Sequence, residues 1–164
     1  MSDIGDITDT LDIHLNINKE DYTLTIGKKW TLLYVLREIL DLTGTKAGCK
    51  TGDCGSCMVL IDGEAIESCI FLAKNAVGKQ IITIEGIADG INLHPIQDAF
   101  VEAGAVQCGF CTPGMVISSK ALLDKNPAPS RSEIAKALER NLCRCTGYIK
   151  IIDAVELASR KLKG

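Results

Sequence analysis

The chain has 164 residues, enough for one domain or for two small ones. It is 46% hydrophobic but only 4% aromatic, so we expect a core of aliphatic side chains. Residues 1–90 hold 14 acidic and 8 basic residues, whereas residues 91–164 hold 7 and 10, and the net charge is −3. The acidic first half argues against nucleic acid as a partner. No signal peptide or membrane-spanning apolar run is visible, so we expect a cytoplasmic protein with reduced thiols and no membrane contact.

The first half of the chain reads as a mixed sheet folded over a helix. Apolar and polar residues alternate from Leu11 to Ile17, as they do in a half-buried strand. Thr31 can cap a helix, and the Asp62-Gly63 pair is typical of a tight hairpin turn. The pattern predicts helices at 32–40 and 71–77 and strands at 11–17, 22–26, 58–61, 64–66 and 80–84.

After about Gly90 the apolar spacing becomes helical. Thr112-Pro113 is a cap followed by proline at a first helical position, and Ser130 with Glu133 forms a capping box. The predicted helices are 95–103, 114–124, 131–142 and 149–163, which indicates a small bundle. We therefore predict an α+β protein with an arm at 1–10, a sheet domain at 11–87 and a helical domain at 91–164.

Eight cysteines form two quartets with no thiol left over. The first quartet consists of Cys49, Cys54, Cys57 and Cys69. Its C-x4-C-x2-C core with a distant fourth thiol has the spacing of plant-type [2Fe-2S] ferredoxins. Three glycines can bring the backbone close to an anionic cluster, namely Gly48, Gly52 and Gly55. Disulfides conflict with a cytoplasmic location, and the spacing is a poor match to a zinc site.

The second quartet consists of Cys108, Cys111, Cys143 and Cys145. It pairs a C-x2-C motif before a predicted helix with a C-x-C motif between two others. Two interhelical turns could hold one cluster, and the helix dipole favours negative charge at the first of them. On spacing alone, these four thiols could instead be the ligands of a zinc ion.

Three motifs in this order, GCKTGDCGSC, AVQCGFCTPGM and NLCRCTGY, closely resemble the small iron–sulfur subunit of the xanthine dehydrogenase, or molybdenum hydroxylase, family. The resemblance extends from about Leu11 to Leu162. It implies a plant-ferredoxin-like β-grasp domain with one [2Fe-2S] cluster, followed by a four-helix domain with the other.

The resemblance also implies partners and an electron route. Gln107 and Cys145 would contact molybdopterin on a separate large subunit, next to the second cluster. The first cluster would pass electrons onward, usually to FAD on a third subunit. No substrate chemistry is expected on this chain itself, and the substrate would be xanthine or another purine, another N-heterocycle such as nicotinate, or an aldehyde.

Three alternatives remain at this point. The chain could be a free-standing electron carrier with two clusters, or a zinc-stabilised binding module. It could also serve a carbon monoxide dehydrogenase or an aromatic thioester reductase of the same wider family. Metal analysis and the identity of co-purifying chains separate these readings.

Overall fold

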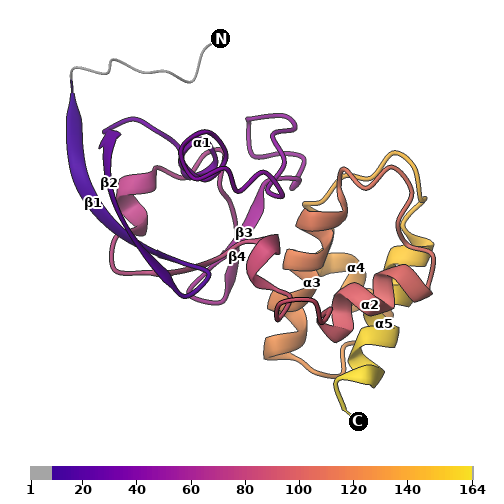
Figure 1. The fold of residues 1–164 in the computed structure, drawn as a ribbon. Helices are drawn as coiled ribbons and strands as arrows, with labels where there is room; N and C mark the ends of the chain where they lie inside the picture. The colour runs from indigo at the N-terminus through magenta and orange to yellow at the C-terminus, as the bar shows by residue number, and fades with distance from the viewer. Residues whose placement is uncertain (1–8, 164) are drawn as a thin grey trace.

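The computed structural model describes residues 9–163 and contains a sheet domain followed by a helical domain (Figure 1). The predicted arm at 1–10 falls mostly outside the described residues. The sheet has the strand order β2-β1-β5-β3-β4, in which β1 and β5 are parallel and the other neighbours antiparallel. Its strands are β1 (Thr10–Ile17), β2 (Glu20–Gly27), β3 (Met58–Ile61), β4 (Glu64–Glu67) and β5 (Gln80–Ile82).

Two tight hairpins set the register of the sheet. Asn18 and Lys19 connect β1 to β2, and Asp62 and Gly63 connect β3 to β4. All four residues have left-handed φ values, between 51° and 85°. Two-residue loops of this kind match the right-handed twist of the paired strands. Alternation in β1 then places Ile13, Leu15 and Ile17 in the core, as the sequence predicts.

The helix predicted at 32–40 has two parts. Helix α1 (Leu32–Tyr34) begins at Thr31, whose side chain accepts the Tyr34 N–H at 3.2 Å. It continues as a wider π-helical turn, η1 (Val35–Ile39), which Leu40 closes by donating to the Val35 carbonyl at 3.1 Å. The buried face of this segment packs against the sheet, which curls around it in Figure 1. This is the β-grasp arrangement.

Two short 3₁₀ helices flank the last strand, β5. They are η2 (Ala73–Ala76), within the predicted helix at 71–77, and η3 (Ile84–Gly86), directly after β5. The helical domain contains four helices within the described residues. These are α2 (Pro95–Glu102), α3 (Thr112–Lys125), α4 (Arg131–Ala137) and α5 (Ile149–Lys161).

The four-helix prediction is confirmed, and the largest difference in a helix boundary is at the end of α4. Helix α4 ends at Ala137, although the sequence pattern predicts helix to residue 142. The reason is tertiary, because the Leu142 amide donates to the Cys54 carbonyl of the sheet domain instead of to the preceding helical turn, and the Asn141 side chain donates to the Gly55 carbonyl. Helix boundaries are set by such competition as well as by local propensity.

The helical core extends into the sheet domain. Ile117 and Ile134 lie at its centre, and Met58 and Leu60 of β3 pack into the same cluster. Helix α3 lies directly beside β3 in Figure 1. Val59, which lies between Met58 and Leu60 in β3, points to the other face of the sheet and packs into the separate core there. One strand therefore contributes alternate side chains to both domains. Across residues 9–163, no helix combines the length and apolar character needed to cross a bilayer.

Candidate metal centres

The first cysteine quartet lies around the loop between η1 and β3. Cys49, Cys54 and Cys57 belong to this loop, and Cys69 follows β4. Gly52 and Gly55 have φ values of 86° and 65°, which glycine adopts without steric cost. Both therefore shape the loop through their backbone conformation, as expected from the sequence.

Gly48 serves the same loop by allowing close packing. A Cβ atom at this position would lie 2.6 Å from the Cys54 sulfur. A side chain here would therefore displace one of the four thiols. Gly48 therefore lies against a thiol of the quartet, whereas Gly52 and Gly55 serve the loop through their positive φ values.

Backbone N–H groups gather around the sulfur atoms of this loop. Cys49 Sγ accepts hydrogen bonds from the amides of Thr51, Asp53 and Cys54 at 3.4, 3.3 and 3.4 Å. Cys54 Sγ accepts one from the Cys49 amide at 3.3 Å. Partial burial of Cys49 opposes its ionisation, but the bonds from Thr51 and Cys54 outweigh this effect and lower its pKa to about 6. The loop therefore favours negative charge on sulfur.

The other two thiols of the quartet are buried. Cys57 and Cys69 pack together with Leu33 beneath the loop. Burial, reinforced by the adjacent Cys57 thiol, raises the pKa of Cys69 to about 12. A further contribution to the raised pKa of Cys69 comes from Cys49, on the other side of the loop.

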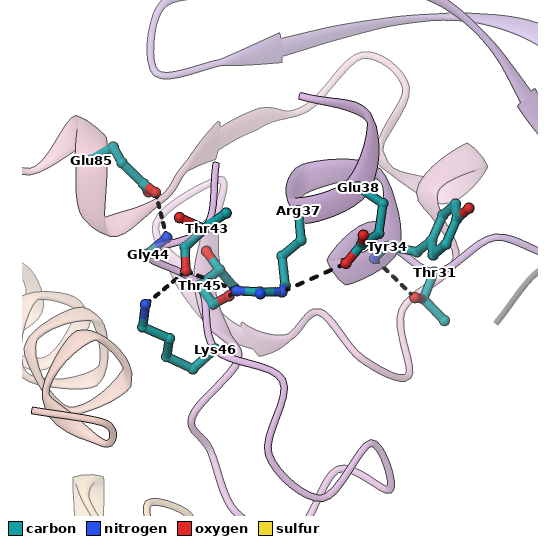
Figure 2. A network of polar contacts seen from close by, with 9 residues as sticks. All are labelled: Thr31, Tyr34, Arg37, Glu38, Thr43, Gly44, Thr45, Lys46 and Glu85. Atoms are coloured by element: carbon teal, nitrogen blue, oxygen red, sulfur yellow. Dashed lines mark hydrogen bonds and ion pairs between the residues drawn. The ribbon is translucent and has the colours of Figure 1, made fainter. Parts of the chain in front are cut away.

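A polar network holds the segment that enters this loop (Figure 2). Arg37, on η1, donates from Nη1 to the carbonyls of Thr43 and Thr45 at 2.8 and 2.9 Å. The amide of Gly44 donates to Glu85 Oε1 at 2.7 Å, which ties the same segment to η3. The segment 43–45, which leads into the quartet loop, is therefore held by hydrogen bonds to η1 on one side and to η3 on the other.

The second quartet is assembled from two distant turns. Cys108 and Cys111 precede α3, and Cys143 and Cys145 lie between α4 and α5. The sulfur atoms of Cys108 and Cys145 are 3.6 Å apart. Burial, and next the neighbouring Cys143 thiol, raise the pKa of Cys111 to about 12. Residues separated by more than thirty positions in sequence thus form one group of four thiols.

Cys143 has a different environment from its partner Cys111. Burial opposes ionisation of Cys143, but hydrogen bonds from the Thr146 side chain and amide outweigh it and lower the pKa. Thr146 Oγ1 lies 3.0 Å from Cys143 Sγ, and the Thr146 amide lies 3.4 Å from it. One sulfur of the second quartet therefore has a side-chain hydroxyl as a hydrogen-bonding neighbour.

The thiols fit an iron–sulfur cluster better than a single metal ion. All eight cysteines are free thiols. Within residues 9–163, no three Cys, His, Asp or Glu side chains surround one point as the ligands of a single ion would. The thiols instead interact in pairs, as two ligands on each iron of a [2Fe-2S] cluster would require. Side-chain hydrogen bonds between thiols join Cys49 with Cys54, Cys57 with Cys69, Cys108 with Cys145, and Cys111 with Cys143.

The two quartets are joined directly by hydrogen bonds. The Leu142 amide donates to the Cys54 carbonyl at 2.9 Å, and the Asn141 side-chain amide donates to the Gly55 carbonyl at 3.1 Å. Leu142 immediately precedes Cys143, so a cysteine of each quartet lies within one residue of this contact. The first turn of α3 also lies close to the loop of the first quartet. A Cβ atom on Gly114 would lie 2.1 Å from the Gly55 carbonyl oxygen.

The sequence interpretation did not identify Asn141 or Gly114 as residues of the site. Asn141 is buried, and Gly114 lies in the first turn of α3. A glycine inside a helical pattern is a recognisable signal for close backbone approach. Asn141 begins the NLCRCTGY motif, but the local sequence does not reveal its hydrogen-bond partner, which is 86 positions away.

The second quartet reaches the protein surface at one point. Gln107, Cys108 and Cys145 are all exposed there, whereas in the first quartet Cys49 is the exposed thiol and Cys57 and Cys69 are buried. Leu142 and Ile149 are also exposed on the nearby turn. The residues expected to contact a pterin are therefore accessible to a partner.

Comparison with known proteins identifies two adjacent domains. Residues 15–81 match the 2Fe-2S iron-sulfur cluster binding domain, and residues 83–156 match the [2Fe-2S] binding domain. The nicotinate dehydrogenase small FeS subunit of Eubacterium barkeri is 49% identical over 146 residues, covering 89% of this chain and 93% of the relative.

Two further proteins share this arrangement. The xanthine dehydrogenase iron-sulfur-binding subunit of Escherichia coli O157:H7 is 44% identical over 150 residues, covering 90% of this chain and 94% of the relative. The crystal structure of quinoline 2-oxidoreductase from Pseudomonas putida 86 aligns with a TM-score of 0.89 at 43% identity, covering 95% of this chain and 98% of that one. The chain belongs to the small iron–sulfur subunits of the xanthine dehydrogenase, or molybdenum hydroxylase, family.

Proposed function

We propose that this chain conducts electrons within a molybdenum-dependent oxidoreductase by holding two [2Fe-2S] clusters. When bound, each cluster accepts and releases one electron at a time. The proposed ligands of the first cluster are Cys49, Cys54, Cys57 and Cys69. The proposed ligands of the second are Cys108, Cys111, Cys143 and Cys145.

The observation that carries this proposal is the direct link between two paired-thiol quartets. The Leu142 amide, one residue before Cys143, donates to the carbonyl of Cys54. The connection therefore consists of short covalent segments and a single 2.9 Å hydrogen bond. A protein that used its thiols only to stabilise two domains would not need to bring the two quartets into contact.

The surface of the second quartet supports a molybdenum subunit as the partner on that side. Gln107 and Cys145 are exposed together beside Cys108, and we assign them to contact with molybdopterin. The related small FeS subunit of nicotinate dehydrogenase is named as one component of a larger enzyme. We place an FAD subunit at the other end of the route, beyond the first quartet, and the whole complex in the cytoplasm.

The named relatives also indicate the class of substrate. Nicotinate, xanthine and quinoline, which appear in their names, are all N-heterocycles. We therefore propose hydroxylation of an N-heterocycle for the complex, with an aldehyde as the alternative substrate. Substrate selection is assigned to the molybdenum subunit, because the functional side chains that we assign on this chain are the cysteines of the two quartets and Gln107.

The proposal is tested by replacing one ligand in each quartet of the purified complex. Cys143→Ser should remove the EPR signal of the second cluster and leave that of the first intact. Cys57→Ser is the reciprocal variant and should remove the first signal. Retention of both signals in Cys143→Ser would contradict the ligand assignment, whereas loss of both in either variant would contradict two separate centres.

A second variant tests the pterin contact. Gln107→Ala should leave both clusters in place and slow the transfer of electrons from molybdenum to the second cluster, measured by rapid-freeze EPR. Glu139→Ala, an exposed position on the same domain, is a control that should not change this rate. An unchanged rate in Gln107→Ala would remove Gln107 from the contact.

A further inference from the structure

The Cys143 sulfur lies in a local network that involves Thr146 and Tyr148. Thr146 Oγ1 is 3.0 Å from Cys143 Sγ, and the amide of the same threonine donates to this sulfur at 3.4 Å. The Tyr148 phenol oxygen accepts the Cys143 amide at 2.9 Å. The turn is thus folded back upon the cysteine, with Tyr148 in a left-handed conformation at φ 68°.

The surroundings of Thr146 determine which group donates in the hydrogen bond between its hydroxyl and the Cys143 sulfur. Thr146 Oγ1 accepts a hydrogen bond from the Tyr148 amide at 3.3 Å, so one lone pair of the oxygen is engaged. A cysteine sulfur bound to iron is a thiolate and has no proton to donate. Once Cys143 is a ligand, the Thr146 hydroxyl must be the donor and the sulfur the acceptor.

We propose that the Thr146 hydroxyl raises the reduction potential of the second [2Fe-2S] cluster through its hydrogen bond to Cys143. This inference rests on the proposed function, in which Cys143 is a cluster ligand. Reduction adds one electron and therefore one negative charge, while the hydroxyl proton stays on its oxygen. A donor aimed at a ligand sulfur stabilises the reduced form more than the oxidised form.

The first quartet also has a threonine side chain beside a sulfur, Thr51 beside Cys49, but the hydroxyl proton of Thr51 is engaged by Asp53. Cys49 Sγ receives three backbone amides, which no side-chain substitution removes. The Thr51 hydroxyl on that loop donates to Asp53 at 2.6 Å. Thr146 therefore offers a means to set the potential of one cluster without changing the other.

The test compares Thr146→Val with Thr146→Ser in the complex with its partner subunits. A redox titration followed by EPR gives the potential of each cluster separately. Thr146→Val should shift the second cluster to lower potential, because it replaces the hydroxyl with a methyl group of similar size. Thr146→Ser keeps the hydroxyl and should remain close to the unmodified protein, and the first cluster should not shift in either variant.

Thr112→Val is the matched control. Thr112 follows Cys111 directly, yet among the described residues its hydroxyl makes no hydrogen bond to a cysteine sulfur. The same chemical change beside a ligand should therefore leave the second potential where it was. A shift in Thr112→Val as large as that in Thr146→Val would overturn the proposal.

Iron and sulfide contents separate failure of this inference from failure of the proposed function. An unchanged second potential in a fully loaded Thr146→Val complex would overturn the inference and leave the proposed function intact. If that variant loses the cluster, Thr146→Ala takes its place in the titration. Loss of the cluster in both would also overturn the inference, because the hydroxyl would then build the turn instead of tuning the potential. Absence of iron from the unmodified complex would contradict the proposed function itself.

Discussion

The two quartets bring four thiols together in different ways. The first draws three thiols from the continuous loop 49–57, and its hydrogen bonds to sulfur come largely from the backbone. The second needs two turns separated by more than thirty residues, and a threonine hydroxyl contacts one of its sulfur atoms. A local loop resists side-chain changes, whereas a site assembled from distant turns depends on the helical packing that brings them together.

The largest effect that distinguishes the two regions should come from the helical core. Ile117 is fully buried in α3, and Ile117→Ala should cost about 2–5 kcal/mol by leaving a cavity. We expect the EPR signal of the second cluster to be lost at lower temperature on heating, with the first signal retained longer. Val101→Ala, at an exposed position of α2, is the control. Simultaneous loss of both signals would contradict the proposed independence.

A substitution at Gly55 should instead affect both regions. Gly55→Ala meets an unfavourable φ of 65° and places a Cβ atom 2.4 Å from the Arg140 carbonyl, which together should cost about 2–4 kcal/mol. Both EPR signals should be destabilised on heating.

Gly63→Ala separates backbone strain from crowding. Gly63 also has a left-handed φ, of 85°, but nothing lies within 4 Å of a Cβ atom there. Its substitution should cost about 1–2 kcal/mol and affect only the sheet domain. Equal destabilisation by the two alanines would show that contact between the domains contributes nothing at Gly55.

Asn141 tests how strongly the two regions are joined. Asn141→Ala removes the donor to the Gly55 carbonyl in a buried setting, which should cost about 1–3 kcal/mol. Limited proteolysis between the domains should then proceed faster. Asn16→Ala breaks the exposed bond to Asp21 and is the control, for which we expect no change. Similar proteolysis rates for both variants would remove Asn141 from the interface.

The smallest effect should come from the ion pair between Lys125 of α3 and Glu64 of β4. Both side chains are more than half exposed, so solvent screens the pair. Lys125→Met should cost at most about 0.5 kcal/mol, and high salt should abolish the difference from the unmodified protein. A larger loss that persists at high salt would mean that this pair holds the domains together.

Much of this organisation follows from local sequence patterns. The hairpin at Asp62-Gly63, the capping box at Ser130 and the three-thiol loop 49–57 could be predicted because each depends on neighbouring residues. The π-helical turn at Val35–Ile39 could not, since a periodic apolar pattern looks alike in both helix types. The early end of α4 was also missed, because Leu142 is held by the Cys54 carbonyl, a partner far away in sequence.

The most direct measurement is the metal and sulfide content of the anaerobically purified complex, with this chain quantified separately. We expect about four iron atoms and four labile sulfides for each copy of this chain, two of each per quartet. The complex should show two distinct EPR signals after reduction. Zinc in place of iron, or iron without labile sulfide, would contradict the assignment of two [2Fe-2S] clusters.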